Sequence, residues 1–219
     1  MILAGQRPAI TMKGEPEMKK IVCLVLALLC VSVMAVAEST PSKTTADLTL
    51  IQTSAANLPE GASFTLAPVT TARAADLPDY EERVAACEAE IAKLAQSASV
   101  AEYFGTVTDS EGNEINLTEI LGADALNVYE FLPLVVDGYD PAYGNVTATM
   151  EFSTPYEEGE QVVVLVGLVT VAEDGTEAMA WTALPGLGTS NGGIEVEFTP
   201  EIMVQIQEGT AMMTVVSAN

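Results

Sequence analysis

The chain has 219 residues, of which 31 are acidic and eight are basic, so its formal net charge is −23. This acidity argues against nucleic acid or an anionic membrane surface as a partner, because both require a basic protein face. The sequence contains no histidine, which excludes Ser-His-Asp and Cys-His nucleophile pairs and imidazole metal ligands. Three cysteines are too few for a disulfide framework or an all-cysteine zinc site.

The N-terminus carries the pattern of a secretory signal peptide. Met18, Lys19 and Lys20 form a basic start, residues 21–33 are apolar, and the motif Ala-Val-Ala ends at Ala37. We therefore expect a signal peptide over residues 18–37, cleaved near Ala37, and a secreted product with no membrane insertion after cleavage. Residues 1–17 show no fold signal, and we interpret them as a leader upstream of the true start at Met18.

Removal of residues 1–37 leaves 182 residues with 29 acidic and four basic side chains, a net charge of −25. One cysteine, Cys87, remains in this mature chain, so an intrachain disulfide is excluded. Residues 38–45 (ESTPSKTT) have the composition of a disordered linker. The remaining length suits one large or two small domains, and we expect a monomer without a cofactor, calcium being the one ion to consider.

Residues 46–125 predict a small α/β region. Two strands are expected over residues 48–52 and 63–68, and a long helix over residues 79–98, capped by Asp76 or Asp79. A Ser99-x-x-Glu102 capping box predicts a further helical turn, followed by a hairpin over residues 106–116 and a turn of helix over residues 117–121. The apolar positions of the long helix recur four and three residues apart, as one stripe: Tyr80, Val84, Cys87, Ile91, Leu94 and Ala98.

In residues 126–219 apolar side chains recur at every second position, which predicts strands with one buried face. Strands are expected over residues 146–152, 177–184, 194–198 and 210–216, and a fully covered central strand over residues 161–171. One short helix is expected over residues 201–207, between Thr199 and Gly209. The fold class predicted is α+β, with the N-terminal helical segment followed by an antiparallel immunoglobulin-like β-sandwich. The long helix is a candidate to cover the sheet that contains residues 161–171.

Alternating strand directions bring the loops 137–145, 172–176 and 199–209 to one end of the sheet and the loops 154–160 and 184–193 to the other. At the first end, Asp137, Tyr139, Asp140 and Tyr143 are candidate ligand-binding residues, because tyrosine combines an apolar face with a hydroxyl group. The alternative is that the tyrosines pack inward and seal the end of the fold. Calcium is a second possibility at this end, with oxygen ligands from Asp137, Asp140, Glu173 and Asp174. The alternative is that these acids simply lie in solvated turns, where acidic residues are common.

Three further features have a functional and a structural interpretation. Glu195 and Glu197 lie on one strand face with Cα atoms ~6.6 Å apart, a separation within the range of inverting glycosidases. No neighbouring residue in the sequence would desolvate either acid, so a solvated strand face is the simpler explanation. Cys87 on the helix stripe is either a small buried side chain or the site of an intermolecular disulfide. Trp181 is either a core residue or a ligand platform, and its mid-strand position favours the core.

Three segments, SVAEYFG (Ser99–Gly105), VTATMEFSTPY (Val146–Tyr156) and GTAMMTVVS (Gly209–Ser217), resemble uncharacterised secreted proteins of Gram-positive anaerobic gut bacteria. The resemblance implies an extracytoplasmic bacterial protein with an immunoglobulin-like C-terminal half. We expect a secreted, non-enzymatic protein that binds an unknown protein or glycan. The alternatives are a carboxylate-dependent extracellular hydrolase and a calcium-stabilised structural module.

Overall fold

A computed structural model describes residues 50–68, 77–171 and 177–218. They belong to a compact unit, Ser39–Asn219. The predicted leader (1–17), signal peptide (18–37) and linker (38–45) lie outside the described residues and stay predictions. In the described parts of the chain, every helix is too short or too polar to cross a membrane.

The described strands form one sheet, which is antiparallel apart from a single parallel bridge between β3 and β9. Its main path follows the order β1-β7-β10-β9-β8-β11-β6-β2, while β5 pairs with β11 and β3 pairs with β4. The strands are β1 (Leu50–Ala56), β2 (Ser63–Leu66), β3 (Val107–Thr108), β4 (Glu114–Ile115), β5 (Leu126–Val128), β6 (Leu132–Asp137), β7 (Val146–Phe152), β8 (Gln161–Val171), β9 (Glu177–Gly188), β10 (Ile194–Phe198) and β11 (Ala211–Ala218).

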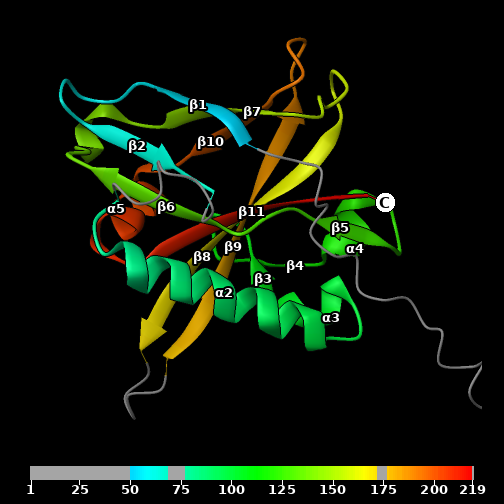
Figure 1. Cartoon of the computed structure of the whole chain (residues 1–219). Coiled ribbons are helices and arrows are strands. Elements are labelled where there is room, and N and C mark those ends of the chain that lie inside the picture. The colour runs from blue at the N-terminus through cyan, green and yellow to red at the C-terminus, as the bar shows by residue number, and fades with distance from the viewer. Residues whose placement is uncertain (1–49, 69–76, 172–176, 219) are drawn as a thin grey trace, which may run out of the picture. The chain divides into compact units, whose positions relative to one another are not determined.

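The sheet curls like a barrel, so that its two end strands, β1 and β2, approach each other (Figure 1). With the helices this confirms the predicted α+β class. The structure shows one continuous sheet, however, where the sequence predicted the two facing sheets of an immunoglobulin-like sandwich. The alternating pattern could not separate the two folds, because strands of a sandwich and of a curled sheet both bury one face.

The N-terminal strands belong to the same sheet as the C-terminal ones. β1 pairs with β7 from Leu50 to Ala56, and β2 pairs with β6 from Ser63 to Leu66. Residues on either side of position 126, which the sequence assigned to separate regions, therefore share one hydrogen-bonded framework.

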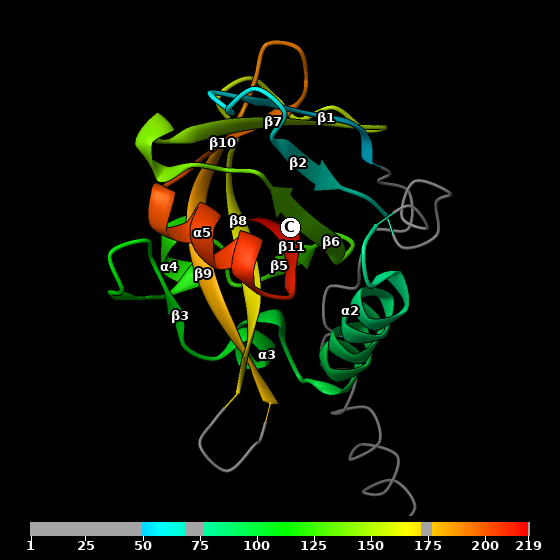
Figure 2. The same ribbon diagram turned by 90° about the vertical axis from the view of Figure 1, so that its left-hand side faces the viewer.

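The inner face of the sheet encloses the larger hydrophobic cluster. Phe198, Leu134, Val164 and Met213 are fully buried in it. Helix α5 (Pro200–Glu208) contributes three buried side chains to this cluster and closes one end of the barrel (Figure 2); these are Ile202, Met203 and Ile206.

A second hydrophobic cluster lies on the outer face of the sheet, beneath a layer of helices. This layer consists of α2 (Tyr80–Gln96), α3 (Val100–Phe104) and α4 (Leu117–Leu121), with the β3–β4 hairpin beside it (Figure 1). α2 packs against β6 and β11, and α4 packs against β8. The helix stripe thus covers the sheet that contains residues 161–171, as the sequence suggested.

Strand β8 is buried on both faces from Val162 to Gly167, as predicted, whereas Thr170 and Val171 at its end are exposed. Val162 and Val164 belong to the inner cluster, whereas Val163 and Leu165 belong to the outer one. On the outer side Gly167 pairs with Trp181 of β9, and a Cβ atom on the glycine would lie 2.6 Å from the indole ring. Trp181 is 6% exposed, which confirms its interpretation as a core residue.

The long helix forms where it was predicted, with two differences. Cys87 and Leu94 of the predicted stripe are buried, but Ala98 lies beyond the end of α2 and is exposed. Asp79 occupies the N-cap position in a left-handed conformation (φ 53°), and its side chain makes no capping hydrogen bond. Two other local predictions hold: Ser99 Oγ caps α3 by accepting from Glu102 N at 3.0 Å, and Gly122 ends α4. Two strands run further than predicted, since β1 continues to Ala56 and β9 to Gly188.

Candidate functional site: the Arg83 pocket

The predicted grouping of loops at the two ends of the sheet is confirmed for the described loops. At one end, α5 contacts β6 and the short helix η2 (Pro141–Tyr143). At the other, Tyr156 N donates to Gly192 O at 3.0 Å and Gly188 N donates to Glu160 O at 2.8 Å. The loop 172–176 lies outside the described residues.

The four candidate ligand-binding residues at the first end differ in burial and in hydrogen-bond partners. Tyr139 is 5% exposed, and its hydroxyl donates to Gly144 O at 2.6 Å, so its ring seals the barrel end. Asp140 Oδ1 accepts from Ala142 N at 2.9 Å and caps η2. Tyr143 is 56% exposed. Asp137 alone lines a pocket, described below.

The proposed calcium ligands are only partly described. Glu173 and Asp174 lie outside the described residues, while Asp137 and Asp140 are both exposed. No group of three or more acidic or cysteine side chains suited to a metal ion occurs within the described residues. Calcium at this end stays a prediction.

The two glutamates of β10 are exposed on the outer side of the sheet. Glu195 pairs with Thr149 of β7 and with Leu187 of β9. Glu197 Oε1 accepts from Asn145 Nδ2 at 2.8 Å. An exposed strand face keeps such carboxylates hydrated, whereas an acid catalyst needs a desolvated one.

The strongest candidate site is a pocket of about 430 Å³ between β2, β6, the start of α2 and α5. We call it the Arg83 pocket. Its volume lies in the range typical of small-ligand sites, ~300–1,000 Å³. The residues that line it are Ser63, Thr65, Leu77, Pro78, Arg83, Val135, Val136, Asp137, Ile206 and Gln207.

Strand register builds the floor of the Arg83 pocket. Ser63 pairs with Asp137 and Thr65 pairs with Val135, so these four side chains share one face of the β2–β6 ladder. Val135 and Leu77 are buried together in a small hydrophobic cluster beneath the start of α2. The floor is therefore apolar next to the helix and polar toward the end of β6.

Arg83 is held at the pocket by two backbone carbonyls. Its Nε donates to Pro78 O at 3.0 Å and its Nη1 donates to Leu134 O at 3.4 Å. A guanidinium group has five N–H bonds, so three of them have no partner among the described residues. Arg83 also forms no ion pair with any described residue.

Arg83 and Lys93 are the only basic residues in the described parts of the chain. Lys93 Nζ forms an ion pair with Glu90 at 2.5 Å. Arg83 is therefore the one cation of the described residues whose charge is not matched by an acidic partner, in a chain with a net charge of −23. A guanidinium fixed in this way is suited to bind a planar anionic group, above all a carboxylate.

A buried carboxylate lies on the same helix, one turn beyond Cys87. Glu90 is 5% exposed and accepts a hydrogen bond of 2.6 Å from Tyr103 OH. Burial and the hydrogen bond to Glu90 raise the pKa of Tyr103 well above its usual range. Because both oxygens of Glu90 are taken, by Tyr103 and Lys93, this cluster ties α2 to α3 and is structural.

Replacing Tyr103 by phenylalanine is expected to lower the free energy of unfolding by about 1–3 kcal/mol, because the buried Glu90 carboxylate loses one of its two partners. Urea unfolding followed by Trp181 fluorescence measures the change. Tyr143→Phe, which alters an exposed side chain, is the control. An unchanged free energy in Tyr103→Phe would mean that Glu90 does not depend on this hydrogen bond.

Cys87 is fully buried between this cluster and the sheet. Burial, followed by repulsion from Glu130 and Glu90, raises the pKa of its thiol to about 12. The thiol is therefore neutral and inaccessible, which confirms the interpretation of Cys87 as a small buried side chain.

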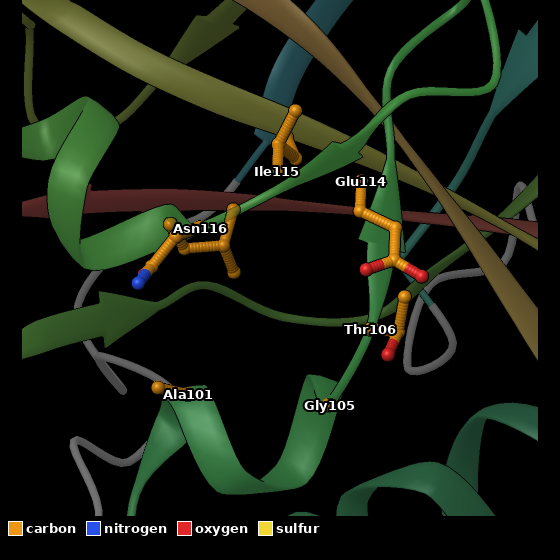
Figure 3. A pocket seen from close by; sticks show the side chains of 7 residues that line it. Ala101, Gly105, Thr106, Glu114, Ile115 and Asn116 are labelled. Carbon is orange, nitrogen blue, oxygen red and sulfur yellow. The ribbon is translucent and has the colours of Figure 1, made fainter.

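A second pocket, of about 280 Å³, lies between the end of α3 and β4. Figure 3 shows Glu114 and Thr106 on one side of it and Asn116 on the other. Asn116 Oδ1 accepts from Thr118 N at 3.1 Å and caps α4, so this side chain already has a structural role. With an exposed glutamate and no basic residue in its lining, this pocket lacks the charge that distinguishes the Arg83 pocket.

No family model, curated protein or solved structure matches the chain. Arg83 and Glu90 were not singled out from the sequence, because charged residues are expected on the solvent face of an amphipathic helix. The usable signal was the scarcity of cations: a helix arginine in so acidic a chain was a candidate for a specific role.

Proposed function

We propose that the protein is a secreted, non-catalytic binding protein of the bacterial extracytoplasmic space, and that it binds a small carboxylate-bearing ligand in the Arg83 pocket. The observation that carries the proposal is Arg83 itself, fixed by two carbonyls at the edge of a pocket of about 430 Å³. The signal-peptide pattern of residues 18–37 supports secretion, and the resemblance to secreted bacterial proteins points the same way.

Two features favour binding over hydrolysis. The chain has no histidine to act as a general base. A carboxylate-dependent hydrolase would use Glu195 and Glu197 or Asp137 and Asp140. Glu195 and Glu197 are exposed and do not line the Arg83 pocket, and Asp137 lines it without Asp140, which caps η2. The polar groups of the pocket itself, a guanidinium, two hydroxyls and a carboxylate, suffice to orient a ligand.

The proposal is tested with propionyl-Ala-Ala, a neutral chain that ends in a single carboxylate, added to the 15N-labelled protein. We expect saturable amide shifts in NMR spectra, centred on Ser63, Thr65 and Asp137, because these residues line the pocket. The C-terminal amide of the same compound, which has no charge for Arg83 to bind, should produce much smaller shifts.

Two variants make this test specific. Arg83→Gln is expected to weaken binding at least tenfold, because it removes the guanidinium charge and its forked donors. Lys93→Gln, which removes the other described cation, should bind as the wild type does. Similar shifts in wild type and Arg83→Gln, or no saturable shifts in the wild type, would contradict the proposal. Trp181 fluorescence of each variant checks that the fold is intact.

A further inference from the structure

The Arg83 pocket carries two opposite charges that do not neutralise each other. Arg83 lies against the carbonyl of Leu134, and Asp137 lies three residues further along β6. At ~3.3 Å per residue, these two points on the strand are ~10 Å apart. No ion pair joins Arg83 to Asp137, so both remain available to a ligand.

The charge of the whole molecule restricts what this pair can bind. The net charge is −23, and Glu81 and Glu82 are exposed in the first turn of α2, close to Arg83 in the sequence. These carboxylates repel a ligand with net negative charge over a range of ~8 Å at physiological salt. A ligand that carries an ammonium group as well as a carboxylate avoids this penalty, because its net charge is zero and its cation interacts favourably with Asp137.

The surface between the two charges suits an extended backbone. Ser63 and Thr65 lie on the same sheet face as Asp137, and their hydroxyl groups form no hydrogen bond with a described residue. Gln207 is occupied, since its Oε1 accepts from Tyr139 N at 2.7 Å. The free hydroxyls can pair with peptide N–H and C=O groups, while Leu77, Pro78 and Val135 offer apolar contact to small side chains.

We propose that the ligand of the Arg83 pocket is a short zwitterionic peptide of about three residues, with its C-terminal carboxylate on Arg83 and its N-terminal ammonium on Asp137. This inference rests on the proposed function and assigns a ligand class to the same site. An extended chain spans at most ~3.3–3.6 Å per residue, so three residues cover ~10 Å, the distance between the two charged positions.

Calorimetric titration with matched ligands tests the assignment. Trialanine has both charges, propionyl-Ala-Ala lacks only the amino group, and trialanine amide lacks only the carboxylate. We expect trialanine to bind at least tenfold more tightly than either of the other two. In Asp137→Asn, the preference for trialanine over propionyl-Ala-Ala should fall to about twofold or less. Asp124→Asn, the same change at an exposed acid outside the pocket, should retain the full preference.

The possible failures are distinguishable. Equal dissociation constants for trialanine and propionyl-Ala-Ala, both weakened by Arg83→Gln, would overturn the zwitterion inference and leave the proposed function standing. A preference for trialanine that persists in Asp137→Asn would also overturn it. If none of the three ligands binds in an Arg83-dependent manner, both the inference and the proposed function are overturned.

Discussion

Replacing Phe104 by alanine is expected to lower the free energy of unfolding by about 3–5 kcal/mol. Phe104 is 4% exposed and joins α3 to the outer face of the sheet. Its ring packs edge-on against Trp181 at a centroid distance of 5.1 Å and lies 4.6 Å from the ring of Tyr103. The variant would leave a cavity among these aromatic rings that their neighbours cannot fill without losing the edge-to-face contacts.

This substitution also tests whether the helical layer and the sheet unfold together. Urea unfolding should give one coincident transition for Trp181 fluorescence and far-ultraviolet circular dichroism, in the wild type and in Phe104→Ala. Tyr143→Ala, at a residue that is 56% exposed, should change the free energy by less than about 0.5 kcal/mol. Two separate transitions would mean that residues 77–125 are an independent unit and would contradict the single framework described above.

Alkaline pH is expected to destabilise the fold strongly. Burial raises the pKa of the Cys87 thiol from 9.0 to about 12. Burial is also the largest of the causes that raise the pKa values of Tyr103 and Tyr156 above their usual 10.0. The unfolded chain loses these protons near pH 9–10, whereas the folded chain keeps them. The stabilisation is therefore complete below about pH 9 and is lost as the pH rises, by up to ~1.4 kcal/mol per pH unit for each group.

Urea midpoints at pH 8, 9.5 and 10.5 measure this dependence. With three groups involved, the loss should steepen toward ~4 kcal/mol per pH unit above pH 10. Tyr156→Phe removes one of these groups and should reduce the slope by about a third, while Tyr143→Phe, at an exposed tyrosine, should leave it unchanged. A free energy of unfolding that stays constant from pH 8 to 10.5 would contradict the burial of these side chains.

Local structure was predictable wherever one physical signal dominated. The almost wholly apolar run of residues 161–171 predicted a strand covered on both faces, and β8 is covered in this way from Val162 to Gly167. The ends of α3 and α4 were predicted from capping residues and from glycine. A side-chain cap or a left-handed residue satisfies the free backbone groups at a helix end. These features depend on residues within one turn of each other.

The sheet topology could not be predicted in the same way. β1 and β2 are short and precede the helical layer, yet they pair with β7 and β6, far along the chain. Alternation in each strand gives its buried face but carries no information about its partner. The sequence therefore indicated the strands and their loop ends, but could not distinguish one curled sheet from two facing ones.

The Arg83 pocket was hidden for a related reason. Its lining comes from four elements that are distant in the sequence, β2, the start of α2, β6 and α5. Of its charged residues only Asp137 was a candidate beforehand, through its loop position. Tyr139, chosen for its chemistry, proved to be a core residue because its hydroxyl finds a partner in Gly144 O at 2.6 Å. Residue type alone could not decide whether a side chain lines the pocket, as Asp137 does, or packs into the core, as Tyr139 does.

A crystal structure of the protein grown with trialanine tests the assignment of the Arg83 pocket most directly. The peptide carboxylate should lie within hydrogen-bonding distance of the Arg83 guanidinium, with the peptide extended along the β2–β6 face toward Asp137. A peptide bound elsewhere on the molecule, with the Arg83 pocket holding only solvent, would contradict the placement of the binding site.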